Sequence, residues 1–154
     1  MSASFRISVL SGKSVAQAFP LIQATWPTAD MGTWQSYVEF FNERTGGEDG
    51  GIVALHDTAG YICGVLAYRL DRDLHAGPFL SVHLFTAVDL LSSLRTVRAL
   101  LDVAEARARA LGCTGMQIRL HKEQTRLAAR LRGLGLSSDH RLFWTDIDVA
   151  SPPH

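Results

Sequence analysis

The chain has 154 residues, the length of one ordinary domain with a core of its own. Apolar residues make up 47% of it and charged residues 19%, a balance typical of globular rather than disordered proteins. Lys and Arg total 15, as do Asp and Glu, so the formal net charge is zero. Because no basic or acidic excess would gather an oppositely charged partner, we expect binding neither to nucleic acid nor to a membrane surface.

The two cysteines, Cys63 and Cys113, lie far apart and each among apolar residues, which predicts buried free thiols rather than a disulfide. The N-terminal segment lacks a secretory apolar region, and no apolar run reaches the roughly 18 residues that a membrane span needs. We therefore expect a cytoplasmic protein. The histidines form no cluster and no zinc-type cysteine spacing is present, so no metal is predicted.

The first third of the chain is predicted to form one strand and two helices. Residues 5–10 alternate between apolar and polar with the period of a strand. Ser14 can cap a helix over 15–24, in which Pro20 implies a kink or a division into two short helices. A second helix can begin at Asp30. Its apolar positions follow helical spacing: Trp34, Tyr37, Val38 and Phe41.

A glycine-rich loop at 45–51 is followed by three predicted strands. The strands cover 52–56, 61–70 and 79–88, joined by turns at 57–60 and 71–78. The pattern is that of antiparallel hairpins.

The clearest predicted helix covers 92–111 and ends at Gly112, which is typical of a C-cap. One apolar stripe runs along it, formed by Leu94, Val97, Leu101, Ala104, Ala108 and Leu111. Two pairs of opposite charges four residues apart lie on its outer surface, Arg98–Asp102 and Glu105–Arg109.

The remaining residues predict a strand over 116–120, a helix over 124–134, a last strand over 142–149 and a loose tail at 151–154. The order of elements is therefore β-α-α-β-β-β-α-β-α-β. It predicts a single α/β (α+β) domain over 1–150, whose mixed sheet is antiparallel first and gains a parallel crossover later.

This order, and several local strings, resemble the GNAT acyl-CoA N-acyltransferase superfamily. Tyr61-Ile-Cys-Gly64-Val-Leu-Ala is similar to the family's third strand, and the run 98–112 to its long helix. Met116-Gln-Ile-Arg-Leu120 resembles its fifth strand, and Leu134-Gly135-Leu136 its usual Leu-Gly-Phe ending. The resemblance covers nearly all of the chain from residue 50 on; before that, only the order of elements matches.

The resemblance implies that an acyl-CoA binds where the fourth strand splays from the fifth. Backbone groups of the fourth strand would contact it, which singles out Phe85, Thr86 and Val88. The family's pyrophosphate loop, (Arg/Gln)-x-x-Gly-x-(Gly/Ala), aligns with Ser92, Ser93, Leu94, Arg95, Thr96 and Val97. This loop is degenerate, because Ser92 replaces the Arg or Gln while Arg95 and Val97 replace the glycines.

Hydroxyls and cations remain at this helix start. Ser92 and Ser93 can cap the helix or donate hydroxyls to phosphate, and Arg95 and Arg98 can pair with phosphates. The alternative is a serine-capped amphipathic helix with solvated arginines.

The family's catalytic groups are only partly matched. A Tyr often serves as the acid for the departing thiolate in an Asn-x-x-Ala-x-x-x-Tyr pattern. Here Gln124, Leu127 and Leu131 stand for the Asn, Ala and Tyr. Leucine donates no proton, so an acid must come from elsewhere or from water. His83 on the fourth strand is the best candidate for the base and His121 the second, although each could be purely structural.

The second predicted helix would help to build the acceptor pocket in this family. Trp34, Tyr37 and Glu39 are the candidates for contacting the acceptor, although core packing also explains the aromatic residues. Asp71 and Asp73, in the predicted turn, could meet a cationic amine.

Two functions follow from the resemblance. The first is an acyl-CoA-dependent N-acetyltransferase, with acetyl-CoA as co-substrate, that transfers an acetyl group directly to an amine of a small molecule or protein. The second is a catalytically inactive GNAT-like binding or assembly module. The resemblance also implies a homodimer, for which Leu142-Phe-Trp-Thr offers an edge.

Overall fold

A computed structural model of the protein describes residues 5–44, 48–88, 93–138 and 145–146. This part of the chain contains five strands, four α-helices and one short π-helix. Within the described ranges, none of the helices combines the length and apolarity that crossing a bilayer requires.

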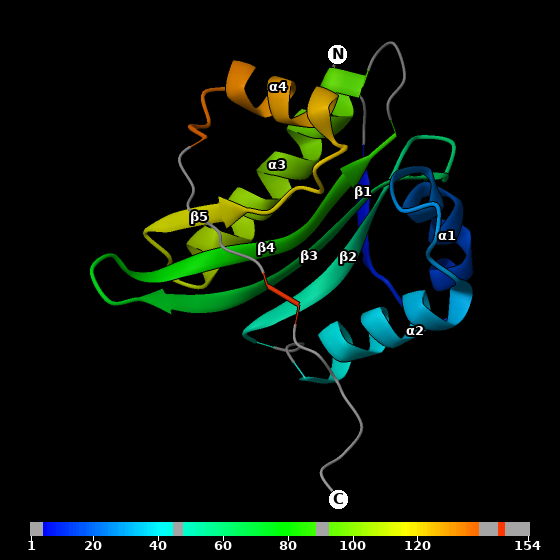
Figure 1. Ribbon diagram of the computed structural model, residues 1–154, viewed down its shortest axis with the longest axis horizontal. Helices are drawn as coiled ribbons and strands as arrows, with labels where there is room; N and C mark the ends of the chain where they lie inside the picture. Colours follow the sequence, from blue (N-terminus) through cyan, green and yellow to red (C-terminus); the bar gives the residue numbers. More distant parts are fainter. Residues whose placement is uncertain (1–4, 45–47, 89–92, 139–144, 147–154) are drawn as a thin grey trace, which may run out of the picture.

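The five strands form one mixed sheet, in the order in which they occur in the chain (Figure 1). They are β1 (Arg6–Val9), β2 (Gly50–His56), β3 (Ile62–Asp73), β4 (Gly77–Ala87) and β5 (Gly115–Ile118). Neighbours from β1 to β4 are antiparallel, whereas β4 and β5 are parallel. The mixed α/β architecture predicted from the sequence is thus confirmed.

The helices cover the sheet on both faces (Figure 1). They are α1 (Lys13–Thr25), α2 (Met31–Glu39), the π-helix Phe40–Arg44, α3 (Ser93–Ala110) and α4 (Thr125–Gly133). One core cluster joins the sheet to α3 and α4, and the other joins its opposite face to α1, α2 and the π-helix. Each face of the sheet is therefore apolar, as burial between two helical layers requires.

The expected last strand at 142–149 and the dimer edge at 142–145 fall mostly outside the described residues. Thr145 and Asp146 are described and belong to no strand.

Helix α1 differs from its prediction in two ways. It is one continuous helix, because Pro20 lies on its exposed side, where water can solvate the carbonyl that loses its N–H partner. Gly12 precedes the helix without a side-chain cap. The Ser14 hydroxyl instead bonds Ser11, accepting from its N–H at 2.9 Å and donating to its carbonyl at 2.7 Å. By contrast, Asp30 caps α2 as expected, its Oδ1 accepting from the Thr33 N–H at 2.7 Å.

Helix α3 confirms most of its predicted pattern. The apolar stripe is buried from Val97 to Ala108, whereas Leu111 at its end is half-buried and Leu94 at its start is 51% exposed. Both predicted ion pairs form, each at 3.7 Å. The helix ends at Ala110, and Gly112 just beyond it has a φ of 73°, the left-handed conformation that the predicted C-cap requires.

The strand boundaries are shifted by a few residues. The turn between β3 and β4 is shorter than expected, so Asp71 lies on β3. The carboxylate of Asp73 forms the turn, accepting from the N–H groups of His75 and Ala76. Both cysteines are free, Cys63 buried and Cys113 only half-buried. Burial raises the pKa of the Cys63 thiol to about 11, which makes it unreactive.

Candidate active site

Strand β4 contains a bulge at His83. Leu84 pairs with Ala67 and Val82 pairs with Tyr68, which leaves His83 as an extra residue. The bulge reverses the alternation of side chains. Before it, Leu80 and Val82 pack toward α3; after it, Phe85 packs toward α3 and Leu84 toward α1 and α2. A bulge also bends its strand, so the second half of β4 takes a different direction from the first.

The pairing between β4 and β5 stops just before this bend. The last paired residues are Val82 and Ile118, and one further bond joins the Arg119 N–H to the Val82 carbonyl at 3.0 Å. Strand β4 continues to Ala87. Its second half therefore has one edge on β3 and one edge that no described strand covers.

The backbone groups of Phe85 and Ala87 face this open edge. The Phe85 carbonyl accepts a hydrogen bond from the Gln124 side chain there, whereas the Val88 N–H donates to the Cys63 carbonyl on the β3 side at 2.9 Å. Successive residues of a strand direct their N–H and C=O groups to alternate edges. The open edge is consequently a row of peptide donors and acceptors.

Gln124 holds the start of α4 beside this edge. Its Nε2 donates to the Phe85 carbonyl at 3.0 Å, and its Oε1 accepts from the His121 N–H at 2.7 Å. One side chain thus connects the β5–α4 loop to β4 across the opening. This gives Gln124, which stands at the family's Asn position, a structural role that the sequence did not reveal.

A cavity of about 600 Å³ lies where these elements meet. Its walls are α1 between Gln17 and Thr25, the end of β4 from Thr86 to Val88, and residues 123–127 around the start of α4, with Ile62 from β3. The Thr25 and Thr86 hydroxyl oxygens are 3.5 Å apart. The cavity therefore adjoins the free backbone edge of β4.

The predicted acyl-CoA contacts lie partly at the end of β4 and partly in the first turns of α3. Thr86 and Val88 line the cavity. Phe85 offers only backbone groups, because its side chain is fully buried toward α3. Sequence reasoning missed the charged lining residues Glu123 and Arg126; their position within two residues of Gln124 was the available signal.

The predicted phosphate-binding residues occupy the first turns of α3. Leu94 and Arg95 are exposed, and Thr96 is half-buried. Arg98 pairs with Asp102, while the Val97 side chain is buried in the core, so it does not obstruct the outer surface of the helix start. Ser92 and the Ser93 side chain lie outside the described residues.

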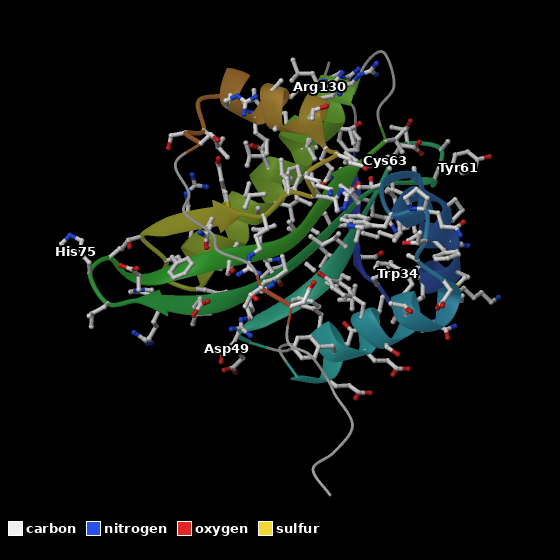
Figure 2. All side chains as sticks on the ribbon, in the orientation of Figure 1. Trp34, Asp49, Tyr61, Cys63, His75 and Arg130 are labelled. Atoms are coloured by element: carbon white, nitrogen blue, oxygen red, sulfur yellow. The ribbon has the colours of Figure 1, made fainter. Side chains whose placement is uncertain are left out.

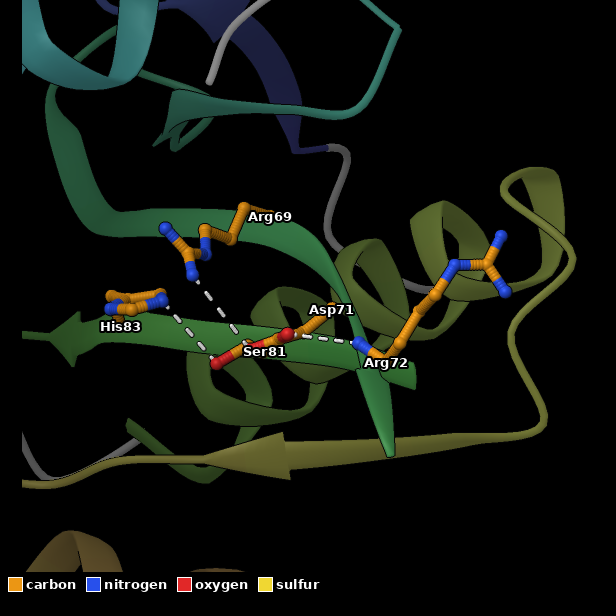
Figure 3. Close-up of polar contacts among 5 residues, drawn as sticks. All are labelled: Arg69, Asp71, Arg72, Ser81 and His83. Carbon is orange, nitrogen blue, oxygen red and sulfur yellow. Dashed lines mark hydrogen bonds and ion pairs between the residues drawn. The ribbon is translucent and has the colours of Figure 1, made fainter. Parts of the chain in front are cut away.

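His83 lies half-buried on the face of the sheet that carries α2 (Figure 3). Its Nε2 is 3.3 Å from the Ser81 hydroxyl, and its ring centroid is 5.6 Å from that of Phe41. Partial burial, and then the positive charges of Arg119 and Arg69, lower the pKa of His83, whereas Asp71 opposes them. The imidazole is therefore neutral near pH 7 and able to accept a proton, although it does not line the cavity.

His121, the second candidate base, has one nitrogen already occupied. Its Nδ1 accepts from the Glu123 N–H at 3.2 Å, and its ring packs edge-on against Trp26 at 5.7 Å. It lies beside the cavity-lining residues of the α4 start without lining the cavity itself.

The three acceptor-site candidates on α2 lie apart from the cavity lining. Trp34 is only 3% exposed and donates from Nε1 to the Val15 carbonyl at 2.7 Å, which favours the packing interpretation (Figure 2). Tyr37 stacks on Trp34 at 6.0 Å, and burial raises its pKa, so the phenol stays protonated. Glu39 is exposed.

Leu131, at the position of the family's acid, is buried in the core. No group of three or more potential metal ligands gathers within the part of the chain that the structure describes.

The fold is shared with solved acetyltransferases, although no protein-family model and no curated protein sequence matches the chain. An aminoglycoside N-acetyltransferase in complex with CoA superposes with a TM-score of 0.75 at 12% identity, covering 96% of this chain and 97% of that one. The 6'-N-acetyltransferase of Acinetobacter baumannii that acts on aminoglycoside antibiotics gives 0.71 at 13%, covering 96% and 100%.

A protein described as a transcriptional regulator, from Bacillus halodurans C-125, gives a TM-score of 0.74 at 12% identity, covering 94% of this chain and 100% of that one. The chain thus has the GNAT fold, in agreement with the resemblance seen in its sequence.

Proposed function

We propose that this protein binds an acyl-CoA, with acetyl-CoA as the simplest case, and transfers the acyl group directly to an amine. The observation that carries the proposal is the free backbone edge of β4, which adjoins a cavity of about 600 Å³ between α1 and α4. The GNAT fold supports it, because solved structures with this fold include N-acetyltransferases in complex with CoA.

The residues present fit such a co-substrate. Its arm contains amide groups, for which the N–H group of Phe85 and the peptide groups of Ala87 are available at the open edge, while the Phe85 carbonyl is bonded to Gln124. Its phosphates are anionic, and Arg95 stands exposed in the first turn of α3, where the positive end of the helix dipole adds to its charge. The glycines of the family's loop are missing, so we assign the phosphates to side chains rather than to close backbone approach.

Acyl transfer needs polarisation of a carbonyl and removal of a proton. The thioester supplies an electrophilic carbonyl carbon; the amine nitrogen bonds to it, the carbon–sulfur bond breaks, and the thiolate leaves. Backbone N–H groups at the open β4 edge would stabilise negative charge on the carbonyl oxygen. His83, neutral and on the same strand but outside the cavity lining, would receive the proton of the amine through bridging waters. Water would protonate the thiolate, because Leu131 is a buried leucine.

A catalytically inactive binding module is the second candidate. Arg95 and Val97 in place of glycines, and Leu131 in place of the tyrosine, favour it. Acyl-CoA binding without acyl transfer to any amine would support this module instead.

The test is calorimetric titration of the protein with acetyl-CoA and with CoA, repeated on a matched pair of variants. Ala24→Trp fills the cavity from α1, whereas Ala16→Trp places the same side chain on an exposed position of α1 outside the cavity lining. We expect micromolar binding that Ala24→Trp weakens at least about tenfold and Ala16→Trp leaves unchanged. No heat and no thermal shift with either ligand would refute the proposal. Acyl transfer is then measured as the release of free thiol in the presence of each of a panel of amines.

A further inference from the structure

A polar cluster lies on the face of the sheet that carries α1 and α2, next to the β4 bulge (Figure 3). Arg69 and Asp71 of β3 point to this face, since they alternate with Tyr68, which packs toward α3. Ser81 and His83 of β4 lie beside them and contact each other at 3.3 Å. The proposed acetyltransferase chemistry uses only His83 of this group.

Arg69 has a donor without a partner. Its Nε is buried and makes no hydrogen bond among the described residues. Among the described residues Arg69 forms an ion pair with Asp71, where Nη2 and Oδ2 are 3.9 Å apart, too far for a hydrogen bond. A buried N–H without an acceptor is unfavourable, so an acceptor oxygen supplied by a ligand would stabilise it.

A second guanidinium adds to the positive charge of the cluster. Arg119 lies between Ile118 and Leu120, which pack toward α3, so its side chain points to the opposite face, and its N–H donates to the Val82 carbonyl next to His83. Asp71 offsets one of the two arginines, and its Oδ1 also accepts from the Arg72 N–H at 2.8 Å. With His83 neutral, the cluster keeps one uncompensated positive charge.

The cluster is accessible to a ligand. The side chains of Arg69 and Asp71 are each 41% exposed, and Arg119 is exposed. A small turn of the Arg69 guanidinium would present Nε and Nη2 together, and this pair of parallel donors matches the two oxygens of a carboxylate or phosphate.

We propose that Arg69 and Arg119, with the Ser81 hydroxyl and His83 beside them, form an oxyanion-binding site that holds a carboxylate or phosphate group of the acyl acceptor. The acceptor part of this inference rests on the proposed transferase function. The site lies on the same face of β4 as Thr86, which lines the cavity. At about 3.3 Å per residue, roughly 10 Å of strand separates His83 from Thr86, a span that a small amine with a distant acidic group can bridge.

The test is a magnetic-resonance titration of isotope-labelled protein with inorganic phosphate and, in a second arm, with succinate. The signals observed are those of the arginine Nε–H groups. A shift of one signal shows which arginine the probe binds, so phosphate bound at Arg69 is distinguished from phosphate bound near α3. We expect a saturable shift of the Arg69 signal with at least one probe, and the stronger probe identifies phosphate or carboxylate as the preferred group. Arg119→Gln should weaken this binding about tenfold, since it removes a charged donor.

Arg72→Gln is the matched control, because Arg72 neighbours Asp71 on β3 but extends away from the cluster (Figure 3). It should leave the shift of Arg69 unchanged. No shift of the Arg69 signal with either probe, or an equal loss in Arg72→Gln and Arg119→Gln, would overturn the site. Thermal unfolding of each variant verifies that it is folded.

Acyl-CoA titration separates this inference from the proposed function. Arg69→Gln and Arg119→Gln should bind acetyl-CoA as the unmodified protein does. If the unmodified protein binds no acyl-CoA, the transferase proposal fails while the phosphate titration still decides the oxyanion site. With an active acceptor, Arg69→Gln should raise KM about tenfold for an acidic amine and leave KM unchanged for its neutral ester; equal effects on both would overturn the acceptor assignment.

Discussion

At the scale of single residues, His83 has two roles in the structure. As the extra residue of the bulge it bends β4, and as a side chain it stands among two arginines and one aspartate. Its imidazole is kept neutral by partial burial and by neighbouring positive charge, which is the protonation state that a general base requires.

The first prediction concerns the titration of His83. Its pKa should lie below the usual value of about 6.5, as measured from the imidazole proton signals during a pH titration. Arg119→Gln should raise this pKa because it removes a nearby positive charge. Asp71→Asn should lower it further because it removes the carboxylate that favours the protonated ring. A pKa that moves in the same direction in both variants would contradict the electrostatic account.

The lowered pKa of His83 also determines how the folding stability changes with pH. The folded pKa of His83 is below the unfolded value, so the unfolded chain binds the proton more readily. This contribution to folding stability is complete above about pH 6.5 and decreases as the pH falls toward the folded pKa. The His83→Gln variant should lose less stability between neutral and mildly acidic pH than the unmodified protein does.

The second prediction tests Gln124 as the connection across the opening. Gln124→Leu removes two hydrogen bonds and leaves the Phe85 carbonyl and the His121 N–H without their partner. We expect a loss of about 2 kcal/mol in the free energy of unfolding, measured with denaturant. Gln117→Leu, at an exposed position of β5, is the matched control and should change it by less than about 0.5 kcal/mol. Equal losses would mean that the bridge contributes nothing.

At the scale of elements, α3 shows both the success and the limit of pattern reasoning. Its extent, its ion pairs and its terminal Gly112 follow from the sequence, because spacing alone determines which residues share a side of a helix. The burial of Leu100 was not predicted. It follows from close contact with the sheet, since a Cβ added at Gly64 would lie 3.4 Å from a Leu100 methyl.

The third prediction compares two leucines of α3. Leu100→Ala should lower the free energy of unfolding by about 3 kcal/mol, because it leaves a cavity against the sheet. Leu94→Ala should lower it by less than about 0.5 kcal/mol, because that side chain is 51% exposed. Denaturant unfolding of both variants measures the difference. A large loss in Leu94→Ala would mean that the stripe predicted from the sequence extends to the helix start after all.

Among the features of the strands, the bulge in β4 was not predicted from the sequence. The alternation of Leu80, Val82 and Leu84 predicts a regular strand, from which the adjacent apolar pair Leu84-Phe85 departs. Both members of that pair are buried, on opposite faces, so the pair alone does not show where the register shifts. Because the cavity depends on this register, its lining from α1 could not be anticipated either.

At the scale of the whole molecule, the order of elements was sufficient to predict the architecture. Antiparallel hairpins followed by a helix and a parallel strand allow few arrangements, and right-handed crossover removes most of these. The site is harder to predict, because it forms between α1 and α4, which are about a hundred residues apart in the chain (Figure 1).

The fourth prediction concerns how ligand binding stabilises the whole folded protein. A ligand that binds only the folded protein raises its stability by an amount that grows with the logarithm of ligand concentration. Acetyl-CoA at about 100 times its Kd should therefore add roughly 2.7 kcal/mol to the free energy of unfolding, seen as a rising melting temperature. His83→Gln should show the same rise, because it lies outside the cavity lining, and Ala24→Trp should lose it. A rise that survives in Ala24→Trp would place the ligand elsewhere.

The bulge at His83 also has an evolutionary consequence. The opening beside β4 comes from one inserted residue and from peptide groups, which all amino acids except proline share. Substitutions can therefore accumulate along this strand while the opening persists, whereas deletion of a single residue there would restore regular pairing and close it. The number of residues in this strand should therefore matter more to the opening than their identity.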